Sequence, residues 1–308
     1  MLLDLLFRSE ILKAIRKYFY TTSVIEVVTP VIQKFASSEV FIESIEVKNY
    51  GYLHTSPEHA MKHLLSKYKD SIFQICPVFR SNEIGSFHKE EFQMLEWYRS
   101  SFDLMKLVED TEKLLRFVLK EIADDFDCVY PRFFFEKISY KSLFSRAFSE
   151  NPHTVSIEKL SQISESLNIS SVSYSRSEYL DLLFALKIQP QIIAPTFVLD
   201  YPVCQAAQAE ISLNDESEKV ANRFELFIEG VELANAYQEL RDPDELLTRF
   251  NDNNIIRRLH GKREITADHQ LLKSLPLMPA CAGASLGIDR LMKIISGSPD
   301  ISKFYDID

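Results

Sequence analysis

Hydrophobic positions recur along the chain with two different periods. Apolar side chains at helical spacing predict amphipathic helices in residues 5–19 and 104–122, and a further helix is expected at 242–259. Shorter runs that are rich in β-branched and aromatic residues predict strands instead. These runs lie at 24–28, 41–47, 52–55 and 196–202. The mixture of both periods predicts an α+β protein rather than an all-helical or all-β one.

Another helix is expected over residues 56–68. Ser56 suits its N-cap and Pro57 its first helical position, while Glu58 falls in the first turn. An acid in a first turn is favoured by the helix dipole, so Glu58 by itself does not indicate function.

His59 and His63 lie four residues apart on that helix, and His54 lies just before it, which raises the question of a metal site. No convincing set of further ligands occurs nearby in the sequence. A solvated helix face is therefore the preferred interpretation.

Two strand-like runs, 72–80 and 92–98, predict an antiparallel hairpin with a polar loop between them. Arg80 and His88 flank that loop. Alternation places four side chains of the second run on one face, namely Phe92, Met94, Glu96 and Tyr98. An arginine fork suits phosphate oxygens and an aromatic face suits a flat base, so the hairpin is a candidate nucleotide site. A plain hairpin with a solvated loop explains the same pattern.

A second hairpin is expected from the runs 223–228 and 231–237, joined by Glu229-Gly230. Glycine at the second loop position fits a two-residue turn. In that register Glu225 lies diagonal to Glu232 on the same face. The two carboxylates would repel each other unless a cation lies between them.

The remaining stretches add three expectations. Residues 140–190 are serine-rich and helix-forming and contain no glycine, which predicts a helical insertion. A strand or buried corner is expected at 133–138. Residues 281–295 read as a strand of small residues that is followed directly by a helix.

Several acids are expected on the solvated surface, namely Glu43, Glu46, Glu109, Asp110 and Glu112.

Composition narrows the class of protein. The 308 residues are 46% hydrophobic, which supports a substantial core, and the net charge of −10 argues against a broad nucleic-acid binder. A few local arginines would still suffice for ATP. No cleavable leader and no apolar run of about 20 residues is evident, so we expect a soluble, cytoplasmic protein without membrane contact. Four widely spaced cysteines are expected as free thiols, at Cys76, Cys128, Cys204 and Cys281.

Three separated segments together resemble the class II aminoacyl-tRNA synthetase catalytic domain. Pro30 matches the end of that family's motif 1, and 79–98 matches the Phe-Arg strand, loop and returning strand of motif 2. Gly283 to Arg290 matches the Gly-x-x-x-Gly-x-Asp-Arg pattern of motif 3. The resemblance implies an antiparallel sheet flanked by helices.

The closer resemblance is to the lysyl branch, and especially to its stand-alone paralogues, the elongation factor P lysine ligases. It extends from about residue 5 to 295 and is carried by 55–58, 91–99, 196–206, 223–226 and 232–240. It implies a single catalytic domain over 1–308 with the insertion at about 140–190. Motif 1 arrives by residue 30, so we expect no anticodon-binding domain and no tRNA partner. A homodimer formed through motif 1 is also implied.

The implied reaction is activation of a carboxylate by ATP, which gives an aminoacyl-adenylate and pyrophosphate without an enzyme nucleophile. The activated lysine or (R)-β-lysine then passes to a lysine of elongation factor P. The resemblance assigns the ATP contacts to Arg80, His88, Phe92 and Arg290, with Arg80 on the α-phosphate and the substrate carboxylate, Phe92 on adenine and Arg290 on the γ-phosphate. It assigns Mg²⁺ to Glu225 and Glu232.

The resemblance also implies an acid-rich amino-acid pocket, formed by Ser56, Glu58, Glu96, Tyr98, Asn235 and Glu239. Such a pocket suits a substrate with two ammonium groups, because a buried ammonium needs a paired carboxylate. Ser285 stands where typical lysyl-tRNA synthetases have glycine, and a small side chain there favours the ligase.

Two positions depart from the family pattern. Asn82 replaces the glutamate that accepts from the adenine amino group; either its carbonyl still accepts, or the loop shifts and Glu83 serves. Ser86 replaces a loop arginine. Alternative functions are therefore a truncated lysyl-tRNA synthetase or a ligase for another acceptor, and a non-catalytic synthetase-like binding protein. Asn82 and Ser86 are the only support for the last of these.

Overall fold

A computed structural model describes residues 2–85, 88–126, 134–169 and 174–299 together with Ile301 and Phe304. The chain divides into two compact units. Unit 1 comprises Met1–Phe133 and Glu239–Asp308, and unit 2 comprises Phe134–Gln238. Both units combine mostly antiparallel strands with helices, which confirms the α+β fold class. The single catalytic domain stays a prediction.

The larger sheet in unit 1 has four strands among the described residues. Their order is β1 (Ile25–Glu26), β5 (Ile72–Phe79), β6 (Glu91–Ser100) and β12 (Cys281–Gly287). β5 and β6 form the first predicted hairpin, with Val78 opposite Phe92, and β12 pairs antiparallel with the other edge of β6. Helix α9 (Ile288–Ser296) follows β12 directly, as predicted.

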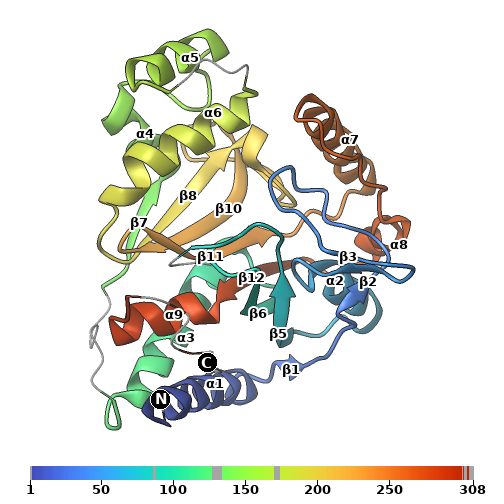
Figure 1. Cartoon of the computed structure of the whole chain (residues 1–308), viewed down its shortest axis with the longest axis vertical. Coiled ribbons are helices and arrows are strands. Elements are labelled where there is room, and N and C mark those ends of the chain that lie inside the picture. Colours follow the sequence, from blue (N-terminus) through green and yellow to red (C-terminus); the bar gives the residue numbers. More distant parts are fainter. Residues whose placement is uncertain are drawn as a thin grey trace. The chain divides into compact units, whose positions relative to one another are not determined.

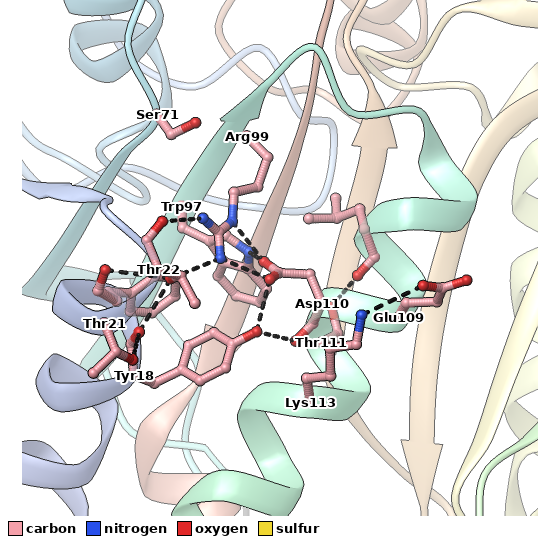
Figure 2. A network of polar contacts seen from close by, with 12 residues as sticks. Tyr18, Thr21, Thr22, Ser71, Trp97, Arg99, Glu109, Asp110, Thr111 and Lys113 are labelled. Atoms are coloured by element: carbon pink, nitrogen blue, oxygen red, sulfur yellow. Dashed lines mark hydrogen bonds and ion pairs between the residues drawn. The ribbon is translucent and has the colours of Figure 1, made fainter.

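Two long helices of unit 1 lie side by side in Figure 1, α1 (Leu2–Thr21) and α3 (Leu104–Ile122). Both were predicted. A buried polar network ties them to β6 (Figure 2): Asp110 on α3 accepts hydrogen bonds from Tyr18, Trp97 and Arg99. Asp110 is therefore not on the solvated surface, because its carboxylate balances a buried guanidinium. Because successive residues of a strand point to opposite faces, Glu96 and Tyr98 of β6 face away from Trp97 and Arg99.

A small sheet of unit 1 has the order β2 (Ile32–Gln33), β4 (Gly51–Leu53) and β3 (Glu46–Val47). The strand predicted at 41–47 was therefore mostly wrong. Only its last two residues join a ladder, because the preceding loop bonds elsewhere: Ser81 N donates to Glu43 O. The strand predicted at 24–28 is likewise shortened to β1.

Helix α2 (Glu58–Tyr68) begins one residue later than predicted, with Pro57 as its N-cap. The Ser56 hydroxyl still accepts from the Glu58 amide at 3.1 Å, so it satisfies an amide of the first turn. Two further helices follow in unit 1, α7 (Pro243–Leu259), as predicted, and α8 (His269–Ser274).

The histidines of α2 face α8 and its N-cap. His59 Nδ1 lies 3.5 Å from an Asp268 carboxylate oxygen, and His63 Nδ1 lies 2.9 Å from the Ser274 hydroxyl. No group of three potential metal ligands converges within the part of the chain that the structure describes.

Unit 2 contains the second predicted hairpin. Its strands run in the order β11 (Val231–Gln238), β10 (Lys219–Ile228), β8 (Thr196–Pro202) and β7 (Glu136–Ser139), and β9 (Ile211–Leu213) also pairs with β10. Ile228 pairs with Val231 as predicted. Glu229 and Gly230 have φ values of 52° and 72°, as a type I′ turn requires.

The helical insertion predicted at 140–190 is confirmed and appears in green and yellow in Figure 1. It comprises α4 (Tyr140–Phe148), α5 (Ile157–Ser166), α6 (Arg176–Leu183), a π-helical turn (Phe184–Ile188) and a 3₁₀ turn (Gln189–Gln191). Tyr140 and Phe144 on α4 and Leu180 on α6 are fully buried in one apolar cluster with Val198 of β8. The insertion thus packs on the strands of its own unit.

Three cysteines fall within the described residues, and all are free thiols. Cys76 and Cys281 are buried, as expected, and Cys204 is exposed. Cys128 and Ser86 lie outside the described residues, as does Phe133 of the predicted 133–138 strand. None of the described helices is long and apolar enough to cross a membrane.

Candidate active site

Arg80 and Phe92 lie against each other at the loop end of the β5–β6 hairpin. The Arg80 guanidinium carbon is 5.1 Å from the centre of the Phe92 ring, and Nε donates to the Thr55 carbonyl at 3.3 Å. Arg80 Nη1 also lies 3.8 Å from a carboxylate oxygen of Glu83. The structure therefore brings together a cation and an aromatic face that were predicted to hold one nucleotide.

Arg290 lies in the first turn of α9, and its Nη2 is 2.7 Å from His88 Nε2. A small cleft runs beside this pair and is lined by Glu83, His88, Phe92, Gly287, Asp289, Arg290 and Ile301. Asp289 is buried and accepts from Arg8 Nη1 at 3.1 Å and from the Gln93 amide at 2.7 Å. It thereby anchors the start of α9 and supports the position of Arg290.

Asn82 follows Arg80 with a φ of 64°, and its amide donates to a Glu90 carboxylate oxygen at 2.9 Å. Asparagine tolerates this left-handed conformation better than glutamate does. The asparagine side chain thus suits the backbone conformation of this loop.

An acidic cluster lies on the opposite face of β6 from the Asp110 network. Its members are Ser56, Glu58, Lys62, Glu96, Tyr98 and Glu239. Glu96 accepts from the Ser56 hydroxyl at 2.6 Å and from the Tyr98 hydroxyl at 2.7 Å, and it is 3% exposed. Burial, together with the charge of Glu58, raises the pKa of Glu96 to about 8, so this carboxyl is largely protonated at neutral pH.

Lys62 is a member of the acidic cluster that the sequence did not reveal. It is fully buried in α2, and its Nζ lies 2.7 Å from Glu58 Oε1 and 2.7 Å from Glu239 Oε2. The only signal was the i, i+4 spacing of Glu58 and Lys62, which is typical of exposed helix faces as well.

Gly283 of β12 packs directly against two members of the acidic cluster, Tyr98 and Glu239. A Cβ built on Gly283 would lie 2.5 Å from Glu239 Oε1 and 2.5 Å from Tyr98 Cδ1, closer than real Cβ atoms approach. Ser285, two residues further on, pairs with Glu96 across the β12–β6 ladder. The first glycine of motif 3 is thus required by close packing.

Unit 2 holds the other predicted site residues around Arg223, which the sequence also did not reveal. Arg223 Nη2 donates to Glu225 and, at 3.1 Å, to Asn235 Oδ1. Its guanidinium lies 4.5 Å from the Tyr201 ring centre and 5.3 Å from that of Tyr237. Arg223 therefore supplies the cation that the paired acids of this hairpin were expected to need.

Burial raises the pKa of Glu225 to about 7; Arg223 opposes the shift and the nearby charge of Glu232 adds to it. Asn235 Nδ2 donates to the Tyr237 hydroxyl at 3.0 Å, and Tyr201 donates to Glu225 at 2.7 Å. Glu225 and Glu232 thus lie close enough for their charges to interact, as predicted.

Replacing Glu96 with glutamine is expected to raise the melting temperature, with a larger gain at pH 8 than at pH 5. The unfolded chain releases this proton near the ordinary pKa of 4.5, whereas the folded protein keeps it up to about 8, so stability falls as pH rises across that interval. Glutamine removes this cost and can still bond Ser56 and Tyr98. Thermal melts of both proteins at the two pH values test this, and an equal change at both would contradict it.

The sequence pattern of the class II tRNA synthetases (D, K and N) matches residues 1–305. The chain belongs to the class II tRNA synthetase family. Curated relatives of this synthetase-family chain are named elongation factor P–(R)-β-lysine ligase. The protein from Photorhabdus laumondii is 37% identical over 97% of this chain and 93% of its own length, and that from Pseudoalteromonas translucida is 35% identical over 98% and 94%. That from Vibrio atlanticus is 36% identical over 94% and 90%. The resemblance to these ligases is therefore confirmed.

Proposed function

We propose that this class II synthetase-family protein uses ATP to activate (R)-β-lysine, or lysine, and transfers it to a lysine side chain of elongation factor P. The names of its relatives support the substrate and the acceptor. The observation that carries the proposal is the acidic cluster, in which the carboxyl groups of Glu58, Glu96 and Glu239 surround the single ammonium of Lys62. An excess of carboxyl groups suits a ligand that carries two ammonium groups.

In the proposed reaction the substrate carboxylate attacks the α-phosphate of ATP and displaces pyrophosphate. Arg80 holds the α-phosphate and the carboxylate in line, and Arg290 with His88 holds the outer phosphates. The Phe92 ring stacks on adenine, while the side chain of Asn82 or Glu83 accepts a hydrogen bond from the adenine amino group. Catalysis consists of positioning and charge stabilisation, because no covalent enzyme intermediate is needed.

Mg²⁺ is proposed to bind Glu225 and Glu232, whose carboxylate oxygens are the hard ligands it prefers. Burial raises the pKa of Glu225 and the charge of Glu232 adds to the shift, and a divalent cation would oppose both effects. When bound, the ion neutralises phosphate charge. Asn235 is held by Arg223 and is proposed to contact the amino acid, with Ser285 limiting the space beside Glu96.

We also propose a cytoplasmic homodimer joined through the motif 1 segment. Apolar side chains on that segment are exposed, with Ile25 52% and Val28 90% accessible, so a second copy would cover them. Light scattering tests the oligomeric state.

Pyrophosphate exchange tests the proposed function. We expect ATP–pyrophosphate exchange that depends on (R)-β-lysine or lysine, followed by a mass increase of elongation factor P but no charging of tRNA. If pyrophosphate exchange occurs, tRNA becomes charged and elongation factor P stays unmodified, the result would favour a lysyl-tRNA synthetase activity. If neither lysine nor (R)-β-lysine supports pyrophosphate exchange, every enzymatic interpretation would be contradicted and a binding protein would be favoured.

A further inference from the structure

Lys62 has an unusual position for a lysine. Its side chain is fully buried in α2 between Met61 and Leu65, which belong to an apolar cluster that also contains Tyr98 and Cys281. A lysine is almost never fully buried unless its charge is paired. Here Glu58 pairs with it from the same helix, and Glu239 pairs with it from a distant segment of the chain.

A simple structural ion pair would need only one carboxylate for one ammonium. Lys62 instead holds two carboxylates, while the third acid, Glu96, lies close enough to feel its charge. All three acids lie around Tyr98, whose pKa is raised by burial and by the charges of Glu96, Glu58 and Glu239. The cluster thus contains three carboxyl groups for one ammonium, an arrangement that costs stability rather than adding to it.

We propose that Lys62 is a positioning and specificity residue, whose ammonium holds the carboxyl groups of Glu58 and Glu239 in place so that the acidic cluster accepts the ammonium groups of the amino acid. This inference rests on the proposed function. Without the Lys62 ammonium, the carboxyl groups of Glu58 and Glu239 would lose the cation that holds them together, and fully buried Glu239 would favour its neutral form, because burial disfavours charge. The ligand would then meet a neutral Glu239, and binding would recover only at higher pH.

The charged groups that interact with Lys62 are Glu58 on its own helix, Glu239 after β11 and Glu96 on β6, and Tyr98 lies among these three acids. Burial holds the pKa of Tyr98 well above its ordinary value, so this phenol stays neutral over the working range. The carboxyl groups therefore set the pH dependence of amino-acid binding there.

The test compares Lys62→Met with the parent in amino-acid-dependent pyrophosphate exchange. We expect KM for the amino acid to rise at least about tenfold at pH 7, with KM for ATP within about twofold of the parent. In both proteins the amino-acid KM is expected to rise below a certain pH. In Lys62→Met that pH should be higher than in the parent by about one unit or more. Lys67→Met, on the exposed side of the same helix, is the matched control and should change neither constant.

A double variant separates positioning from packing. In Lys62→Met/Glu239→Gln the buried carboxyl group of Glu239 is gone, so the upward pH shift expected for Lys62→Met should be absent from this double variant. If Lys62→Met does not fold, the double variant is compared with Glu239→Gln alone, and a higher amino-acid KM is expected because Glu58 has lost its partner. An unchanged pH profile or amino-acid KM in folded Lys62→Met, or equal amino-acid KM values in the second comparison, would overturn the inference. An inactive parent would instead overturn the proposed function and the inference with it.

Discussion

Replacing Arg80 with alanine is expected to lower the rate of adenylate formation at least about 10³-fold. Loss of a single preorganised donor to developing charge costs about 10²–10³ in rate, and Arg80 is proposed to serve two anionic groups at once. The fold should survive, because the residue lies at the end of β5 with a partly exposed side chain. Its contact with Phe92 contributes about 0.5–1 kcal/mol.

Pyrophosphate exchange under saturating ATP and amino acid measures this effect, with thermal melting as the check on folding. Arg116→Ala is the matched control, since Arg116 lies on the exposed face of α3 and forms a local ion pair with Glu112. A fully active Arg80→Ala protein would refute the assignment of the nucleotide site.

The second large effect is expected for Gly283→Ala. The added methyl group would overlap Tyr98 and the Glu239 carboxylate, both of which are almost fully buried and cannot move aside cheaply. Either β12 shifts away from β6 or the acidic cluster rearranges. Overpacking of this kind costs about 1–3 kcal/mol of stability. We expect the amino-acid KM to rise by at least about tenfold, while KM for ATP changes less.

Gly261→Ala provides the comparison for Gly283→Ala. Gly261 has a φ of 67°, and a Cβ added there would have no neighbour within 4 Å, so alanine meets backbone strain but no steric overlap. It should cost about 1–2 kcal/mol of stability and leave both KM values unchanged. Equal kinetic effects of the two variants would show that loss of stability, not the acidic cluster, is responsible.

The elements that the sequence predicted well are those whose signal is local. The two-residue turn at Gly230 predicted the β10–β11 pairs beside it, Ile228 with Val231 and Phe227 with Glu232, but not the bulge after Leu226 that brings Asn235 opposite Glu225. The α3 bounds followed from its apolar stripe. The loop before β3 was mistaken for a strand because its apolar residues carry no information about where their amides bond. Local pattern cannot distinguish these cases.

The predicted site positions came from motif order, and the structure groups most of those in unit 1 into the Arg290 cleft and the acidic cluster. Lys62, Arg223 and Asp110 escaped prediction for a shared reason. A charged residue is buried only when tertiary contacts bring a partner of opposite sign to it, and those partners are distant in the chain or indistinguishable from surface pairs.

The Asp110 network also affects which parts of the protein unfold locally and which unfold only with the whole. β6 is hydrogen-bonded along both edges, to β5 and β12, and is clamped from behind to α1 and α3. Its amides should therefore be among the slowest to exchange with deuterium, since they are released only by global unfolding. The strand that carries Glu96 and Tyr98 would then be rigid before any ligand arrives, and binding would spend little entropy on ordering it.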